Sequence, residues 1–430
     1  MITTIKYPSA AQMAEILQRP SANNTAMQNS VSDIVNNVKK NGDTAIKDCC
    51  EKFDNIVIGN FEVLKEKWKA AGNMLDTKLK RAIDLAINNI EKFHVAQAEE
   101  MQPVETTEGV ICWRKAVAIE KIGLYIPGGS APLFSTLLML AVPAKIAGCG
   151  EVIVCTPPDR NGNIHPAILY AAYKTGVNRI FSIGGAQAIA AMAYGTQTVP
   201  KVYKIFGPGN SYVTAAKMIV GAAGTAIDIP AGPSEVAILA DDSCVAAFVA
   251  ADLLAQAEHG PDSQVLLITD SPNVLREVCD EVEAQLLLLP RKDVAAGALH
   301  NSKFILVKNL SVGMSIINDY APEHLIIATD NADELAGSVI NAGSVFLGHY
   351  TPESAGDYAS GTNHTLPTGG HARAYSGVSL DSFIKKITFQ KISSQGLQNL
   401  ADTITTMATA EGLQAHAASV TIRLKSTNND

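Results

Sequence analysis

The chain has 430 residues, of which 47% are hydrophobic and 18% charged, and its formal net charge is −8. This length is enough for about two to four domains with large cores. The net negative charge argues against a nucleic acid or an anionic membrane as the partner. The start of the sequence shows no basic segment followed by an apolar one, so we expect a cytoplasmic protein without a signal peptide.

The weakly charged stretch 131–147 contains Lys145 and two prolines, which makes it too short and too broken to span a bilayer. The seven cysteines form no CxxC pair. An odd number of cysteines without a signal peptide favours buried, reduced thiols over disulfides. Cys149 or Cys155 could serve as a nucleophile, but free cysteines are more often small core residues.

Residues 1–105 predict a polar, helical N-terminal region. Apolar residues three and four positions apart, the helical period, recur in the segments 30–54 and 78–101. We expect this region to pack with the second of two α/β units.

Residues 106–233 predict the first α/β domain. Short β-branched runs alternate with alanine-rich helical patterns, and glycines separate them, as in a parallel sheet with crossover helices. The predicted strands are 151–158, 178–185 and 201–209, and the predicted helices are 130–148, 185–195 and 210–222.

Residues 234–378 predict a second α/β domain, in which the same alternation starts again. One of its helices opens with Ser271 as the N-cap and Pro272 at the first helical position. The predicted strands are 234–241, 263–270, 302–309, 324–330 and 343–348, and the clearest helices are 241–260 and 271–289.

Residues 379–430 predict a mostly helical tail. The tail is too short to bury a core alone, so it must pack on its own chain or on a partner. Two α/β units that meet at a cleft fit a dinucleotide enzyme, but they fit a two-lobed binding protein equally well.

Three glycine loops each follow a predicted strand and precede a helix: Tyr125–Ser130, Ile183–Ala188 and Phe206–Val213. Glycine lets the backbone approach a ligand, and a helix N-terminus offers free N–H groups to an anion. Neither GxGxxG nor GxxxxGK[ST] is present, so the usual dinucleotide and nucleotide signatures are missing. We interpret the three loops as one shared ligand cleft.

Gln256 and His259 lie three apart near the predicted end of a helix, which Gly260 and Pro261 terminate. The partly negative C-terminus of a helix suits a cation held between these side chains. A simple histidine cap is the alternative.

Two further pairs of polar residues could contribute to the same site. Asp357 and His364 fall in a long loop rich in Gly, Ser and Thr, and such loops are usually functional. Glu411 and His416 fall in an alanine-rich tail helix, where a spacing of five puts them about 140° apart. A turn cap and a solvated helix face are the alternatives. Two histidines and a carboxylate suit zinc, so Gln256, His259, Asp357 and His416 are the candidate metal ligands.

Glu323 and His324 follow Pro322 and precede a wholly apolar run, a costly place for charge. Adjacent strand residues point to opposite faces, so both can reach one site only at the entry of a strand. Pro322 fits that position, since it cannot donate to a ladder. The alternative is that Glu323 caps the following segment and His324 is a core residue.

The chain resembles the histidinol dehydrogenases, zinc enzymes that complete histidine biosynthesis. The resemblance covers nearly the whole chain and rests on long, unusual motifs. They are "YIPGGSAPLFST", "GGAQAIAA", "FGPGNSYVTAAK", "IDIPAGPSEV", "AQAEHGPDSQ", "YAPEHL", "GSVFLGHYTPESAGDYASGTNHTLPT" and "EGLQAHAAS".

The resemblance implies oxidation of L-histidinol through L-histidinaldehyde to L-histidine with two NAD⁺. It also implies two incomplete Rossmann-like domains, one zinc ion per subunit and an intertwined homodimer whose tails are exchanged. Glu323 and His324 would be the acid–base pair, with His324 as base for the alcohol proton and Glu323 as base for a water that attacks the aldehyde. Zinc would position the substrate's imidazole and amine.

The resemblance also assigns the binding residues. The zinc ligands would be Gln256, His259, Asp357 and, from the partner subunit, His416. Substrate contacts would be Ser234, Gln256, His259, His324, Asp357, His364, Glu411 and His416, and NAD contacts would be Tyr125, Gln187 and Asn210. A zinc hydrolase and a binding protein without catalysis remain the alternatives from the residues alone; the first would not need the glycine loops and the second would not need both Glu323 and His324.

Overall fold

The computed structural model describes the chain in two compact units. Gly129 and Ser130, at the end of the first glycine loop, lie outside the described residues. The described ranges are 2–19, 25–99, 101–128, 132–229 and 232–427. The first unit comprises Met1–Gln97 and Ile119–Phe383, and the second comprises Ala98–Ala118 and Ile384–Asp430.

The first unit contains two parallel sheets, as predicted. Numbered along the chain from β4, the strands of the first sheet lie in the order 3-2-1-4-5, which is a Rossmann arrangement one strand short. The prediction of incomplete Rossmann-like domains is therefore confirmed. In spatial order, the strands are β6 (Arg179–Ser182), β5 (Glu151–Thr156), β4 (Lys121–Tyr125), β7 (Lys204–Phe206) and β8 (Ala226–Ile227).

Helices bury both faces of the first sheet, which explains why its strands read as continuous apolar runs. One face carries α4 (Lys65–Ala71), α5 (Thr77–Val95), α6 (Phe134–Ala147) and α7 (Pro166–Thr175). The other face carries α2 (Thr25–Asn41), α3 (Asp43–Cys49), α8 (Gly185–Tyr194) and α9 (Ser211–Ala222).

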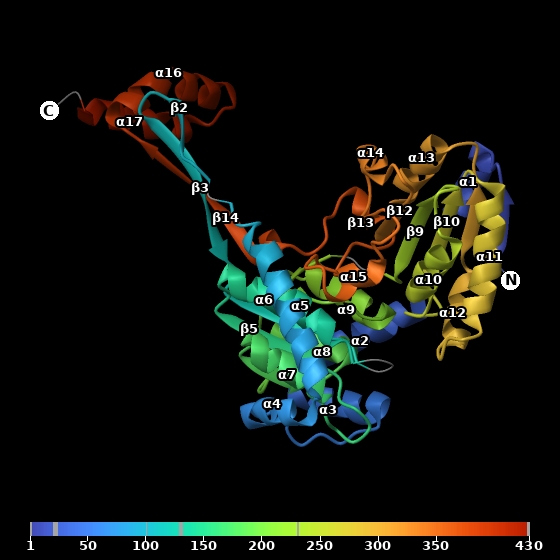
Figure 1. Cartoon of the computed structure of the whole chain (residues 1–430). Coiled ribbons are helices and arrows are strands. Elements are labelled where there is room, and N and C mark those ends of the chain that lie inside the picture. The colour runs from blue at the N-terminus through green and yellow to red at the C-terminus, as the bar shows by residue number, and fades with distance from the viewer. Residues whose placement is uncertain (1, 20–24, 100, 129–131, 230–231, 428–430) are drawn as a thin grey trace. The chain divides into compact units, whose positions relative to one another are not determined.

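The second sheet repeats this order and adds β1 at one edge (Figure 1). All of its strands are parallel: β1 (Thr3–Lys6), β11 (Lys303–Leu306), β10 (Gln264–Thr269), β9 (Glu235–Ala240), β12 (His324–Ala328) and β13 (Ser344–Leu347). One face packs on α10 (Ala246–Ala257), α11 (Pro272–Leu286) and α12 (Lys292–His300). The other face packs on α1 (Ala10–Ile16), α13 (Leu310–Tyr320) and α14 (Ala332–Ala336).

The N-terminal region divides between the two sheets. β1 pairs with β11 of the second sheet, and Ile16 of α1 joins that sheet's core. Helices α2 to α5 instead pack on the first sheet. The sequence pattern predicted the whole region beside the second sheet, which is wrong for α2 to α5, and it did not predict β1, whose partner lies about 300 residues away in the chain.

The second unit holds the tail and an antiparallel sheet in the order β14–β3–β2. Its strands are β2 (Val104–Thr107), β3 (Val110–Ala118) and β14 (Ile384–Ile392), and its helices are α16 (Ser394–Ala410) and α17 (Gln414–Thr427). The tail is mostly helical, as predicted, but β14 was missed because its nine residues pair with a strand far back in the sequence.

The single tail helix assumed for Glu411 and His416 is wrong. Gly412 adopts φ +76°, a left-handed conformation that ends a helix and that glycine accepts without strain. Glu411 is consequently the C-cap of α16, and His416 lies in α17. Both side chains are exposed in this unit.

Across the part of the chain that the structure describes, no helix is both long enough and apolar enough to cross a membrane.

The predicted start of α11 is confirmed, since Ser271 Oγ accepts a hydrogen bond from the N–H of Val274 at 3.3 Å and Pro272 is the first helical residue.

Gly207 follows β7 and lies against the end of the neighbouring strand β4, at the point of the first sheet where the chain connections reverse direction. Its φ is +120°, and a Cβ atom there would lie 2.0 Å from the carbonyl oxygen of Tyr125. Its N–H donates to Asp228 Oδ2 at 2.7 Å, and its carbonyl accepts from Lys217 Nζ at 2.9 Å. Lys217 and Asp228 also form a buried ion pair with each other, so the two side chains that bind the backbone of Gly207 are themselves fixed.

We expect Gly207→Ala to destabilise the protein far more than Gly224→Ala. Gly224 also has a positive φ of +101°, but a Cβ atom there would meet nothing within 4 Å, so only backbone strain of about 1 kcal/mol applies. The collision at Gly207 should add at least about 2 kcal/mol. Urea unfolding of both variants measures the difference, and equal losses would contradict a close approach of β4 and β7.

Candidate active site

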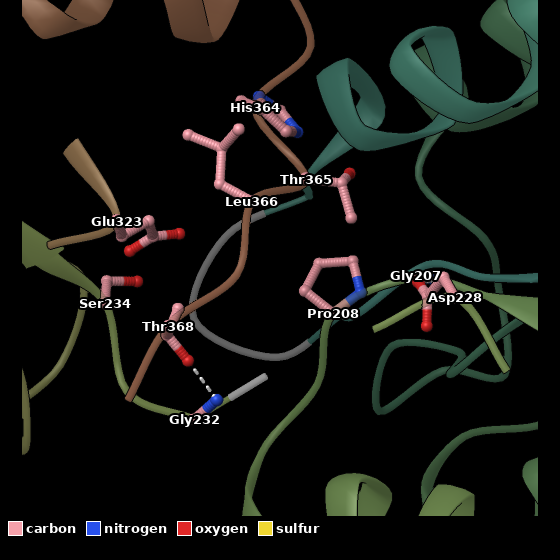
Figure 2. A pocket seen from close by; sticks show the side chains of 10 residues that line it. All are labelled: Gly207, Pro208, Asp228, Gly232, Ser234, Glu323, His364, Thr365, Leu366 and Thr368. Carbon is pink, nitrogen blue, oxygen red and sulfur yellow. Dashed lines mark hydrogen bonds between the residues drawn. The ribbon is translucent and has the colours of Figure 1, made fainter. Parts of the chain in front are cut away.

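The candidate site lies where the two sheets of the first unit meet. Glu323 and Ser234 immediately precede the adjacent strands β12 and β9, so they lie at the amino ends of the second sheet. Gly207 and Asp228 immediately follow β7 and β8, at the carboxyl ends of the first sheet. These residues line one pocket, in which Glu323 and Ser234 lie across from Pro208 and Gly207 (Figure 2). The pocket is lined by Gly207, Pro208, Asp228, Gly232, Ser234, Glu323, His364, Thr365, Leu366 and Thr368.

The turn before β12 sets the direction of Glu323. Ala321 ends α13 in a left-handed conformation with φ 53°, and Pro322 then leads into the strand. The predicted position of Glu323 and His324 at a strand entry is therefore confirmed: His324 is the first residue of β12 and lies opposite Val236.

Glu323 has a buried carboxylate, and one of its two oxygens accepts two hydrogen bonds. Its Oε2 accepts the backbone N–H of Glu235 at 2.8 Å and Nε2 of Gln256 at 3.3 Å. Burial raises the pKa of Glu323 to about 7, although the positive charge of His324 and the bond from Glu235 lower it in part. A carboxyl group with such a pKa can accept and release a proton near neutral pH.

The contacts of His324 identify its basic nitrogen. Nδ1 lies 3.1 Å from the carbonyl oxygen of Glu235, which can only accept, so Nδ1 carries a proton. The amide of Gln256 therefore donates to Glu323 and makes no hydrogen bond to this nitrogen. The second nitrogen, Nε2, is buried, has no hydrogen-bond partner among the described residues and lies 3.8 Å from Asp357 Oδ1.

Negative charge surrounds His324. Burial by itself lowers the pKa of His324, but three carboxylates outweigh it and raise the pKa to about 10; they belong to Glu353, Glu323 and Asp357. The imidazole is thus protonated until a ligand or cation reduces the negative field around it.

Asp357 and Glu353 share one face of α15 (Glu353–Tyr358), because they are four residues apart. The expectation of a loop at Asp357 is corrected by this short helix. Burial tends to raise the pKa of Asp357, but the neighbouring histidines 324, 364 and 259 outweigh it, so the pKa is lowered and Asp357 is ionised. Burial raises the pKa of Glu353 to about 8.

Glu353 was not predicted from the sequence as a residue of the site. It is only 2% exposed, its Oε2 has no hydrogen-bond partner among the described residues, and it clusters with His324 and Asp357 within 4.8 Å. The available signal was the four-residue spacing from Asp357, which has meaning only if the segment is helical.

The chemistry of the donor set fits a zinc-like ion. Gln256 is fully buried, yet its Oε1 finds no partner within the described chain, and the ionised Asp357 lies next to His324. Oxygen and nitrogen donors of this kind suit zinc. His259 follows the C-cap of α10, Glu258, and is exposed, so the prediction that it shares a helix face with Gln256 is wrong. His416, the fourth predicted ligand, belongs to the second unit.

His364, a predicted substrate contact, lies in the loop after α15. Its Nδ1 bonds the backbone carbonyl of Asp357 at 2.9 Å, and its Nε2 lies 3.2 Å from the hydroxyl of Thr136. These contacts tie the loop to α15 on one side and to α6 on the other, and His364 lines the same pocket as Glu323.

The predicted cofactor residues gather at the carboxyl ends of the first sheet. Tyr125 ends β4, and its hydroxyl accepts the N–H of Gly185, the first residue of α8, at 3.1 Å. Gln187 is buried in the first turn of α8. Asn210 caps α9 and accepts from the N–H groups of its first turn, at 3.1 Å each.

Comparison with known proteins gives one consistent result. A family model described as histidinol dehydrogenase matches residues 17–424. The chain is 59% identical to a histidinol dehydrogenase of Bacteroides thetaiotaomicron, over 99% of both chains, and 50% identical to that of Escherichia coli, over 97% of this chain and 96% of the other. The crystal structure of the Elizabethkingia anophelis histidinol dehydrogenase covers 99% of both chains with a TM-score of 0.97 and 52% identity.

We expect Asp357→Asn to weaken zinc binding by more than about 10²-fold, and the isosteric Glu353→Gln to weaken it by no more than about 10-fold. Glu353 clusters with His324 and Asp357 within 4.8 Å but is not among the predicted ligands. Zinc content after dialysis, measured by mass spectrometry, tests both variants. The reverse ranking would make Glu353 the ligand in place of a residue of the predicted set.

Proposed function

The chain belongs to the histidinol dehydrogenase family, and from that premise we propose that it oxidises L-histidinol through L-histidinaldehyde to L-histidine, using two NAD⁺, in the last steps of histidine biosynthesis. The observation that carries the chemistry is the buried pair at the entry of β12. Glu323 and His324 are adjacent in sequence, yet Glu323 lines the pocket whereas the imidazole Nε2 lies 3.8 Å from Asp357 Oδ1, so the two groups suit two different proton transfers.

NAD would bind at the carboxyl ends of the first sheet, with Tyr125, Gln187 and Asn210 as contacts. Helices α8 and α9 begin there, and helix N-termini favour the negative charge of a pyrophosphate. The nicotinamide would then lie toward the pocket that Gly207 and Glu323 share.

In the first oxidation, His324 would take the proton of the substrate hydroxyl at Nε2 as the carbon transfers a hydride to NAD⁺. The bond from Nδ1 to the carbonyl of Glu235 fixes the ring and stabilises the positive charge that forms. In the second oxidation, Glu323 would take a proton from the water that adds to the aldehyde, while His324 would return its proton to the aldehyde oxygen. The resulting hydrate would then lose a hydroxyl proton to the freed His324 and its hydride to the second NAD⁺.

Gln256, His259, Asp357 and His416 of the partner subunit would hold zinc. The bound ion would keep the substrate's imidazole and amine in place and reduce the negative field that raises the pKa of His324. Ser234 and His364, which line the pocket, would contact the substrate from the chain that carries the acid–base pair. Glu411 would contact it from the partner's tail.

Glu323→Gln should slow oxidation of the aldehyde much more than oxidation of the alcohol, because water enters only in the second half. His324→Asn should slow both halves by about 10²–10⁴-fold, the usual range for loss of a general base. Single-turnover stopped-flow measurements of NADH with each substrate test this contrast. Equal losses with Glu323→Gln would contradict the division of roles.

A mixed dimer should test the origin of the fourth ligand. If one chain carries His324→Asn and the other carries His416→Ala, each homodimer is inactive at both sites. A mixed dimer with exchanged tails has one site with both changes and one intact site. Random pairing makes about half of the dimers mixed, so co-refolding with zinc should restore about a quarter of the sites.

The two variants refolded separately are the control, and mass spectrometry reports the fraction of mixed dimers. Mixed dimers without activity would show that His416 acts in its own chain's site or has no role in the site.

A further inference from the structure

The strand next to the acid–base pair, β9, begins with a buried charge that the proposed mechanism does not use. Glu235 is the first residue of β9, and its side chain is 4% exposed in a strand that is otherwise apolar. Arg19 binds both oxygens of its carboxylate: Nε contacts Oε1, and Nη2 donates to Oε2 at 3.0 Å. An arginine fork and a carboxylate match in geometry, so this pair fixes orientation as well as charge.

Arg19 also holds the turn that leads into β12. Its Nη2 donates to the backbone carbonyl of Tyr320 at 2.7 Å, and the guanidinium lies 3.9 Å from the centre of the Tyr320 ring. Tyr320 is fully buried, and its hydroxyl donates to Gln264 at 2.6 Å. The guanidinium group of Arg19 therefore connects the start of β9 with the end of α13, the helix that precedes Glu323.

The backbone of Glu235 binds both acid–base side chains. Its N–H donates to Glu323 Oε2 at 2.8 Å, and its carbonyl accepts from His324 Nδ1 at 3.1 Å. Its carboxylate also accepts the N–H of Gly369 at 3.1 Å, which anchors the loop that carries His364. Any movement of Glu235 would displace these groups together.

We propose that Arg19 and Glu235 are a positioning pair for the reaction: their side chains fix the backbone from which Glu323 and His324 are oriented. This inference rests on the proposed roles of Glu323 and His324. Neither Arg19 nor Glu235 needs to touch the substrate. A displacement of about 1 Å at catalytic groups is enough to lower a rate by about 10²-fold.

The test compares Arg19→Ala with Arg179→Ala. Arg179 forms the same two-point contact with a carboxylate, that of Glu62 at 2.8 and 2.6 Å, and also donates to the carbonyl of Thr198 at 3.1 Å. Arg179 is the first residue of β6, an edge strand of the first sheet, and it does not line the pocket. It is therefore a matched pair without the proposed role.

For Arg19→Ala we expect kcat to fall by about 10²-fold on histidinol and on histidinaldehyde alike, with the KM for NAD⁺ and the zinc content near wild type. Guanidinium at millimolar concentration should restore part of kcat by filling the vacated site. Arg19→Lys keeps the charge and loses the fork, so it should lose activity without responding to guanidinium. Arg179→Ala should keep its kcat and show no rescue.

An unchanged kcat in folded Arg19→Ala would overturn the proposal, and so would equal rescue of both alanine variants. If Arg19→Ala does not fold, Arg19→Lys decides: a wild-type kcat overturns the proposal and a reduced kcat supports it. Failure of the underlying function looks different, because Glu323→Gln and His324→Asn would then keep their activity whatever Arg19 does.

Discussion

Buried backbone groups need hydrogen-bond partners, and the end of a parallel ladder leaves some of them unpaired. The pairing of β9 with β12 begins at Val236 and His324, so Glu235 lies at the end of this ladder. Side chains bind its backbone there: Glu323 accepts from the N–H, and Nδ1 of His324 donates to the carbonyl. The site thus uses the point where the ladder ends, which is why its residues lie at the amino ends of the second sheet and not at the carboxyl ends usual for open α/β folds.

The first sheet follows the usual rule, and the two sheets are therefore complementary. Carboxyl strand ends of the first, with their glycine loops and helix N-termini, face the acidic amino ends of the second across one pocket. The division separates two kinds of chemistry. In the proposed reaction, the glycine loops and helix N-termini of the first sheet would bind the anionic cofactor, and the carboxylates beside the second sheet would hold a cation and move protons.

Local patterns predicted much of this arrangement from the sequence. The strands of both main sheets that carry β-branched runs were recognised, and Pro322 correctly indicated a strand entry at Glu323. Features that depend on distant segments were not predictable: β14 requires its partner β3, and the contact of Arg19 with Glu235 joins residues 216 apart. Glu353 was not predicted for a different reason: its proximity to Asp357 depends on a helix only six residues long. The break at Gly412 was also not predicted, because the composition of the tail is typical of one continuous helix.

The position of Arg19 near the start of the chain has a practical consequence for the boundaries of expressed fragments. β1 and Arg19 serve the second sheet, whereas the helices from Thr25 onward pack on the first sheet. Translation from the internal Met27 would preserve every strand of the first sheet and every residue assigned to substrate or metal. A check of those residues alone would therefore not reveal that the product is shorter. That product would nevertheless lack the guanidinium that orients the acid–base pair, and gene models should therefore be checked for this arginine.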